Sequence, residues 1–412
     1  MPYQFYSRCK FIQRLKNNQG GLIMFMRNKS RISALIVVIT IGLVLSMTGC
    51  SGGNTPSSEK VLTIGVVGPE SGGSAQLGQG QHNAIQLAVD EINEQKLAGE
   101  WKLVAVFEDD EGNPTKSSSA TNKLIQESKA NIIIAAINSS ATLADMVVTE
   151  RAGIPQITPG STGASITEQG NEWIFRTAAN DSFQADALVK HAKEELGITK
   201  IATFTSADDY GQSGANLLKA AAEKYGLELV ANPTYNNGDK DFKPQLMSIK
   251  DGGAEGVFLW GLYTEAALIS NQVQQLGLDV QLFGASGMAA QKLIELGGDA
   301  AQGLILTQTF LPDADIPEVQ EFVQKYTEKY DMDPIPHGAQ AYDTVYIIAN
   351  AVKNTDSSNP EELRDALRNT EGLNLVTGSP KFDEKGNDIG KRLLITEIRG
   401  DKFELIKAIE AK

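Results

Sequence analysis

The sequence predicts an α/β protein with two doubly wound units of parallel β-sheet. From Val61 onward, short apolar runs of strand length alternate with amphipathic segments of helix length, an order typical of α/β folds. This order occurs twice, in two successive halves of roughly 120 residues each, which is an ordinary domain size. The chain has 412 residues, of which 41% are apolar, so it can fill the cores of two such units.

The first half opens with an expected strand at 61–67, followed by an amphipathic helix at 81–95 with four apolar side chains on one face. Asn113 is a favourable cap for a helix that begins with Pro114, because proline lacks an N–H that would be unpaired there anyway. The other segments expected in this half are strands at 102–107, 132–137 and 156–158 and a helix at 141–152.

The second half repeats the alternation and ends in two strands. Each expected strand is a short run rich in apolar residues, and most are bounded by turn-forming residues. We expect helices at 181–196, 212–225, 264–276, 318–330, 338–354 and 360–368, and strands at 200–205, 228–231, 256–260, 280–283, 392–398 and 402–406.

Residues 1–49 have the composition of a secretory leader. They hold seven basic residues and no acidic one, and three of the basic residues directly precede an apolar run at 32–47 that ends in Thr48-Gly49-Cys50. The run is shorter than the roughly 20 residues a spanning helix needs, and polar residues interrupt it. Because Met24 or Met26 would give an ordinary leader at once, we hypothesise that translation starts at one of them.

The rest of the chain is strongly acidic. Without the leader, 30 basic residues face 51 acidic ones, a net charge of −21, which argues against nucleic acid as a partner. The cysteines, Cys9 and Cys50, lie outside the globular part, so no disulfide or thiol chemistry is expected there. Residues 50–60 form a polar tether rich in glycine, serine and proline.

Motifs for catalysis, metals or cofactors are lacking. The three histidines are widely separated, no nucleophile lies beside a base, and no phosphate-binding glycine motif occurs. The acidic run at 108–111 could suit a hard cation. However, four consecutive side chains cannot all point inward from a strand end, so we interpret the run as a solvated loop. We therefore expect no enzyme activity, cofactor or metal.

Two hydroxyl-rich turns follow expected strands, at 138–142 and 158–162. The first turn opens a helix whose leading N–H groups lack partners within the helix, so hydroxyls and N–H groups together could hold a carboxylate. Serine and threonine at such places also act simply as helix caps and turn formers. The residue types alone leave both interpretations open.

Several motifs resemble one known family when taken in order. The chain is similar to the periplasmic-binding-protein type I family, in particular the branch of leucine/isoleucine/valine-binding receptors of ABC importers, from Val61 to the C-terminus. The end of the leader, Leu45-Ser46-Met47-Thr48-Gly49-Cys50, resembles a bacterial lipobox, with Met47 departing from the usual pattern. The motifs in the globular part are Ile64-Gly65-Val66-Val67-Gly68-Pro69, Ala88-Val89-Asp90-Glu91-Ile92-Asn93, Ile154-Pro155-Gln156-Ile157-Thr158-Pro159, Phe175-Arg176-Thr177, Asp209-Tyr210-Gly211, Asp239-Lys240-Asp241-Phe242 and Ala341-Tyr342-Asp343.

The resemblance implies two Rossmann-like lobes joined by three crossovers, with the ligand held between the lobes at the strand ends. It places the crossovers near 177–180, 307–310 and 378–380. Ligand contacts both lobes only when such a clamp is closed, so hinge motion is expected. The implied lobes are 61–177 with 309–378, and 178–308 with 379–412.

The resemblance also implies a ligand site. Ser139 and Thr162 match residues that hold the α-carboxylate of amino-acid ligands, with Gly160 and Ser161 supplying backbone groups. Tyr210 and Tyr263 match aromatic residues that reach in from the second lobe. Leu77 and His337 match side chains that contact the ligand tail.

One position departs from the family pattern. Relatives that bind amino acids usually carry an acid after the strand at 281–283, where it pairs with the ligand ammonium, whereas this sequence has Ser286. Leaving a buried ammonium unpaired would cost several kcal/mol. Either another acid takes over, such as Glu265 or Asp209, or the ligand has no ammonium group.

The expected function is that of an extracytoplasmic substrate-binding lipoprotein, anchored by lipid on Cys50, that captures a small carboxylate for an ABC permease. A branched-chain or related amino acid is the expected ligand, and the protein is expected to be a monomer. The alternatives are a receptor for an aromatic or 2-oxo acid and a ligand sensor. Transport is favoured over sensing because a sensor needs its own route across the membrane.

Overall fold

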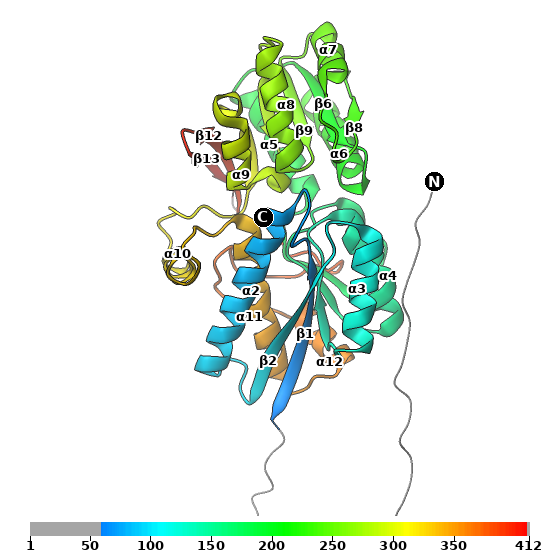
Figure 1. The fold of residues 1–412 in the computed structure, drawn as a ribbon, viewed down its shortest axis with the longest axis vertical. Coiled ribbons are helices and arrows are strands. Elements are labelled where there is room, and N and C mark those ends of the chain that lie inside the picture. Colours follow the sequence, from blue (N-terminus) through cyan, green and yellow to red (C-terminus); the bar gives the residue numbers. More distant parts are fainter. Residues whose placement is uncertain (1–58, 410–412) are drawn as a thin grey trace, which may run out of the picture. The chain divides into compact units, whose positions relative to one another are not determined.

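The computed structural model describes residues 59–409, in which two β-sheets are each covered by helices on both faces (Figure 1). The predicted fold class, α/β with two doubly wound lobes, is confirmed. Predictions for the leader, Cys50 and the tether as far as Ser58 lie outside the described residues.

The first sheet has five parallel strands in the order β2-β1-β3-β4-β5. In this doubly wound order, ligands bind outside the carboxyl ends of the strands. The strands are β1 (Lys60–Gly68), β2 (Trp101–Asp109), β3 (Ile132–Ile134), β4 (Gln156–Thr158) and β5 (Ile174–Arg176).

Side chains alternate between the two faces of β1 and so enter two different cores. Ile64 packs with α2 (Ala75–Gln95) and α11 (Pro336–Thr355), whereas Val67 packs with α3 (Pro114–Gln126) and α4 (Ser139–Ala152). These helix pairs lie on opposite sides of β1 and β2 in Figure 1. The core shared with α2 and α11 also takes in α10 (Pro317–Tyr330) and α12 (Pro360–Arg368), so these later helices complete the first lobe.

The second sheet follows the order β13-β12-β11-β10-β9-β6-β7, with β8 paired to β6. Strands β6, β7, β9, β10 and β11 pair in parallel and repeat the arrangement of the first sheet. Strand β12 pairs antiparallel with both β11 and β13. The strands are β6 (Lys200–Ser206), β7 (Glu228–Ala231), β8 (Thr234–Tyr235), β9 (Gly256–Trp260), β10 (Gln281–Gly284), β11 (Ile305–Gln308), β12 (Leu393–Arg399) and β13 (Lys402–Ile409).

Two helix groups cover this sheet. Phe258 on one face packs with α5 (Asp181–Glu194) and α6 (Asp209–Tyr225), and Val257 on the other packs with the remaining helices of the lobe. Those helices are α7 (Lys243–Gly252), α8 (Tyr263–Gln275) and α9 (Gln291–Gly297).

Helix α2 begins six residues earlier than the sequence predicts. The glycines in its first turns disfavour a helix in isolation. They are needed for packing, because a Cβ at Gly78 would lie 1.9 Å from the Pro69 carbonyl oxygen and one at Gly80 would lie 2.7 Å from Ile335. The extra turns bring Leu77 to the space between the lobes.

The chain passes between the sheets three times: from β5 to α5, from β11 to α10 and from α12 to β12. The segment before the last passage packs on the first lobe. Arg176 N–H donates to Gly386 O at 2.8 Å, Asp388 N–H donates to Arg176 O at 2.9 Å, and Phe382 packs edge-on against Phe175. We therefore propose that the third crossover lies near Lys391 rather than at 378–380, and the other lobe boundaries stay predictions.

Candidate ligand-binding site

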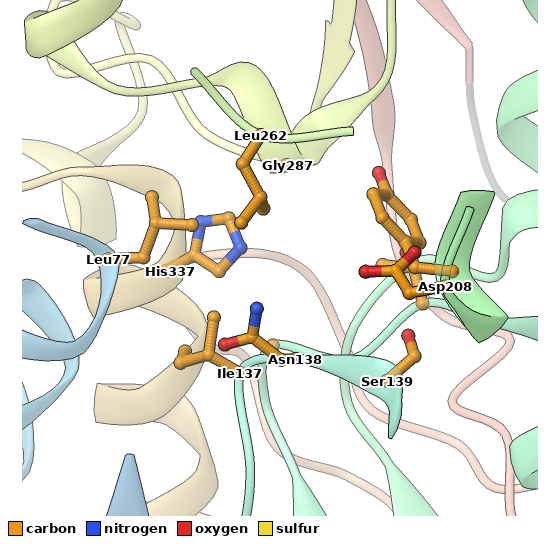
Figure 2. A pocket seen from close by; sticks show the side chains of 11 residues that line it. Leu77, Ile137, Asn138, Ser139, Asp208, Leu262, Gly287 and His337 are labelled. Atoms are coloured by element: carbon orange, nitrogen blue, oxygen red, sulfur yellow. The ribbon is translucent and has the colours of Figure 1, made fainter. Parts of the chain in front are cut away.

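A cavity lies between the lobes at the carboxyl ends of the strands (Figure 2). Its volume is about 20 Å³, which is room for about one water molecule. An amino acid would therefore need the lobes to be further apart. The lining residues are Leu77, Ile137, Asn138, Ser139, Gly160, Thr162, Asp208, Tyr210, Leu262, Gly287 and His337.

The first lobe contributes the N-terminus of α4. Asn138 occupies the cap position, but its side chain makes no capping hydrogen bond to the helix; its Oδ1 instead accepts from Ser74 Oγ at 3.1 Å. The N–H groups of the first turn are thus left without a side-chain cap. This arrangement favours an anion at the cavity, since unpaired N–H groups and the helix dipole both stabilise negative charge.

The turn after β4 lies beside this helix end. Ser139 Oγ accepts a hydrogen bond from Gly163 N at 3.3 Å, and Thr162 is only 4% exposed. The carbonyls of the turn are held from behind by Arg176, which is fully buried: its Nη1 donates to Thr162 O at 2.9 Å and to Gly163 O at 2.6 Å. Arg176 thus fixes the turn without itself lining the cavity.

Ser161, a predicted site residue, does not line the cavity. Its N–H donates to Thr158 Oγ1 at 3.0 Å, and its hydroxyl lies 3.1 Å from Ala136 O, 3.0 Å from Ile137 O and 2.6 Å from Thr142 Oγ1. The N–H and the hydroxyl of Ser161 are thus both engaged inside the protein. Its role is the one expected of a turn former.

The second lobe contributes the start of α6. Tyr210 lines the cavity, and its hydroxyl has no hydrogen-bond partner although the residue is only 8% exposed. Gly287 permits this position, since a Cβ there would lie 2.9 Å from the Tyr210 hydroxyl oxygen. Asp208 caps α6 by accepting from Gly211 N at 3.0 Å and also accepts from Asn237 Nδ2 at 2.8 Å.

Tyr263 and Ser286 are buried but do not line the cavity. Tyr263 Oη accepts a hydrogen bond from Gln76 N at 3.3 Å and so links the lobes. Ser286 N–H donates to Gln184 Oε1 at 3.0 Å. Neither proposed substitute acid is in the right place either: Asp209 is exposed, and Glu265 accepts from Gly238 N at 2.9 Å away from the cavity.

A different acid lies directly behind Thr162. Asp181, the first residue of α5, is fully buried, and neither carboxylate oxygen makes a hydrogen bond of ordinary geometry. Burial raises the pKa of Asp181 to about 6, while the nearby polar groups of Thr162 and the charge of Arg176 lower it. Within residues 59–409, the hydroxyl of Tyr210 and the indole N–H of Trp260 also lack hydrogen bonds of ordinary geometry, although both lie close to this carboxylate. This buried polar group, directly behind the cavity wall at Thr162, is loosely paired and so favours a polar ligand group on the other side of the wall.

The other end of the cavity is apolar. Figure 2 shows Leu77 and His337 on the side opposite Ser139 and Asp208. Burial lowers the pKa of His337 to about 4, so its ring is neutral near pH 7. No lysine or arginine lines the cavity, which leaves N–H and hydroxyl groups as the partners available to an anion.

The acidic run at 108–111 is only partly a solvated loop. Glu108 and Glu111 pair with surface lysines, and Asp109 accepts from Glu70 N at 2.9 Å. Asp110, in contrast, is fully buried. Within residues 59–409, no group of three or more histidine, cysteine or acidic side chains could hold a metal ion, and no helix is long and apolar enough to cross a membrane.

Sequence reasoning thus identified six residues that line the cavity: Ser139, Gly160, Thr162, Tyr210, Leu77 and His337. It missed Ile137, Asn138, Leu262, Gly287, Asp208 and, behind the wall, Asp181. Asp208 directly precedes Asp209, the acid that the sequence analysis considered. It is the N-cap of α6, a position that the sequence can indicate. No pattern marks Asp181, whose burial depends on the packing of both lobes.

The fold and the cavity define a two-lobed α/β binding protein. A profile of the family described as periplasmic binding protein matches residues 61–402, and the chain belongs to this family. It is a family of binding proteins, which confirms the expectation that the chain is not an enzyme.

Similar proteins cover most of the chain. One is the leucine-, isoleucine-, valine-, threonine- and alanine-binding protein of Pseudomonas aeruginosa, 29% identical over 79% of this chain and 87% of its own length. The substrate-binding protein LivJ of Streptococcus pneumoniae, solved in complex with isoleucine, is 28% identical with a TM-score of 0.79, covering 85% of this chain and 100% of that one. An ABC transporter solute-binding protein from R. palustris, solved in complex with benzoate, has a TM-score of 0.78, covering 85% and 97%; at 24% identity it shows the fold alone.

Proposed function

We propose that this protein is an extracytoplasmic receptor that captures a branched-chain or similar amino acid and delivers it to an ABC permease. The names of the P. aeruginosa and S. pneumoniae relatives support an amino-acid ligand. The lipobox-like sequence at Cys50 supports a lipid anchor to the membrane.

The polar end of the cavity suits the main-chain groups of an amino acid. The carboxylate would lie between Ser139 Oγ, the N-terminus of α4 and the turn that contains Thr162. The apolar side chain would extend toward Leu77, Leu262 and His337. Charge-assisted hydrogen bonds to the carboxylate would contribute roughly 1.5–3 kcal/mol each.

The observation that carries the proposal is the unpaired carboxylate of Asp181. The carboxylate is buried behind Thr162, near the polar side chains of Thr162, Trp260 and Ser213 and the charge of Arg176, and a ligand ammonium on the cavity side of Thr162 would add an attractive charge. Asp208 adds a second acidic side chain in the cavity wall. Asp181 and Asp208 would thus take the place of the acid missing at Ser286, which favours a ligand with an ammonium group over one without.

A comparison of leucine with its 2-oxo analogue, 4-methyl-2-oxopentanoate, tests this function. We expect leucine to raise the melting temperature and to bind by calorimetry, and the oxo acid to bind at least about tenfold more weakly, since it lacks one charge-assisted bond. Asp181→Asn should remove most of this preference. Stronger binding of the oxo acid or of benzoate would show that the receptor takes a carboxylate without an ammonium group.

The pH dependence of the affinity gives an independent check. Because burial raises the pKa of Asp181 to about 6, the free protein gains a proton there as the pH falls below about 6, and a neutral carboxyl pairs poorly with an ammonium. Leucine affinity should therefore fall between pH 7.5 and pH 5, and Asp181→Asn should flatten this dependence. An equal slope in the variant would assign the titration to another group.

The second candidate is a receptor for an aromatic or 2-oxo acid, which the absence of an acid at position 286 favours. A sensing role would use the same clamp and is distinguished by the partner: co-purification with permease and ATPase subunits supports transport, whereas association with a signalling kinase supports sensing.

A further inference from the structure

A second, larger cavity lies beside the candidate site. Its volume is about 700 Å³, against about 20 Å³ for the first. Its walls come from α2, α10 and the segment before α11 in the first lobe, and from residues before and within α9, the end of β11 and the turn between β12 and β13 in the second. It therefore also spans the space between the lobes.

Residues that are neighbours in the chain line the two cavities. Leu77 lines the first cavity, and its neighbour Gln76 lines the second; His337 lines the first, and Ile335 lines the second. Leu77 and Ile335 pack in one apolar cluster with Ala289, a residue of the second lobe that lines the second cavity. This region lies at the apolar end of the site, where Figure 2 shows Leu77 and His337.

Ile335 is the side chain in this region that has room to move. It is only partly buried and adjoins the larger cavity. It rests against α2 at Gly80, where a Cβ would lie 2.7 Å from its Cδ1 atom. A change of rotamer needs no movement of the backbone, and the larger cavity adjoins this side chain.

The far cavity combines apolar and acidic surfaces. Four acidic residues and one basic residue line it. Lys402 lies 3.7 Å from Asp313, and Lys292 lies 2.7 Å from Glu295, whereas Asp333 and Asp401 have no ion-pair partner within residues 59–409. The cavity therefore suits an apolar chain, with or without a terminal cation, and disfavours a terminal anion.

We propose that the two cavities form one extended ligand site, in which Ile335 is a gate and the larger cavity receives the tail of amino acids longer than leucine. This inference rests on the proposed function, since it requires the carboxylate and ammonium groups to bind at Ser139, Thr162 and Asp181. It names the ligand class more closely: 2-amino acids with an unbranched apolar tail, or with a tail ending in an ammonium group.

Calorimetry with leucine, 2-aminohexanoate and 2-aminooctanoate tests the extended site. In the purified protein, 2-aminooctanoate should bind at least as tightly as leucine, with each buried methylene contributing up to about fourfold. Ile335→Trp should weaken 2-aminooctanoate by at least about tenfold, because the indole fills the passage, and should weaken leucine much less. Ile335→Ala should strengthen binding of 2-aminooctanoate relative to leucine.

The control is Leu296→Trp, which adds the same indole at an exposed position of α9 outside the cavity lining and should leave both ligands unchanged. The inference is overturned if leucine binds while 2-aminooctanoate binds at least about a hundredfold more weakly in both the wild type and Ile335→Ala. It is also overturned if Ile335→Trp affects the two ligands equally. If no member of the series binds, including leucine, the proposed function itself fails and the extended site fails with it.

Lysine and 2-aminoadipate test the charge of the far cavity. Both have long tails, but one ends in an ammonium group and the other in a carboxylate. We expect lysine to bind more tightly, and the double variant Asp333→Asn with Asp401→Asn to reduce the difference by at least about tenfold. Tighter binding of 2-aminoadipate in the wild type would contradict the assignment.

Discussion

Replacing Arg176 with methionine should weaken ligand binding although Arg176 does not line the cavity. The guanidinium is fully buried and donates to Thr162 O, Gly163 O, Thr167 Oγ1 at 2.9 Å and Asn387 Oδ1 at 3.1 Å. Burial lowers the pKa of Arg176 to about 10, partly offset by the charges of nearby acids, so it remains a cation at neutral pH. Methionine keeps much of the apolar stem and removes every donor.

The expected magnitude follows from the acceptors that lose their partner. Each buried acceptor left without a hydrogen bond costs about 1–3 kcal/mol, and relief from burying a charge offsets part of that cost. We expect the free energy of unfolding to fall by about 2–4 kcal/mol. If the released turn loses one charge-assisted bond to the ligand carboxylate, the Kd rises about 10- to 150-fold.

Urea unfolding and calorimetry with leucine measure the two effects separately, at a temperature where the variant is folded. Asn387→Ala is the matched control, because it removes an acceptor on the far side of the guanidinium and leaves the bonds to Thr162 and Gly163 in place. It should lower stability with little change in Kd. An unchanged Kd in a folded Arg176→Met protein would show that Arg176 does not position the turn.

Three further outcomes are expected. Asp145 is fully buried between α3 and α4, where it accepts from Ser117 Oγ at 2.7 Å and Thr121 Oγ1 at 3.0 Å, and burial raises its pKa to about 8. The native state then holds a proton that the unfolded state has lost, so the free energy of unfolding should fall by about 2 kcal/mol from pH 6 to pH 8. Urea titrations of Asp145→Asn should show a smaller fall. Parallel pH dependences in the wild type and the variant would contradict this assignment. The double variant Ser139→Ala with Thr162→Ala should raise the leucine Kd by at least about tenfold, and an unchanged calorimetric affinity would disprove the carboxylate site. Asn113 accepts from the N–H groups of Thr115 and Lys116 at the start of α3, so Asn113→Ala should lower thermal stability by about 1 kcal/mol without changing ligand affinity.

Most of the fold could be predicted from the sequence because its strands are short apolar runs between amphipathic helices. All ten expected strands are present, and β7 and β9 have the predicted bounds. The sequence analysis missed β5 and β11, which lie next to crossovers, the two-residue strand β8, and the short helices α7 and α9. These segments have few residues with which to show a period.

The site was harder to predict because serine and threonine hydroxyls serve both in turns and caps and in ligand binding. The hydroxyls of Thr142, Thr158 and Ser161 are consumed inside the protein, as the capping interpretation expects. Ser139 and Thr162, which have the same chemistry and lie within a few positions, face the cavity. The path of the backbone decides whether a hydroxyl bonds inside the protein or faces the cavity. This path depends on contacts with Arg176 and α5, which no local sequence pattern indicates.

Thr162 is where the parts of the candidate site meet. Its carbonyl accepts from the N–H of Asp181 at 3.0 Å and from Arg176 Nη1 at 2.9 Å, while its side chain faces the cavity. Asp181 begins the first helix after the first crossover, and Arg176 is bonded through Asn387 to the segment that leads to the third. A movement at either crossover must therefore move the backbone of Thr162 or break one of these buried bonds. Because breaking a buried bond is costly, we infer that opening of the clamp and release of the ligand carboxylate are coupled at this residue, and that substitutions near the crossovers change ligand affinity as well as hinge motion.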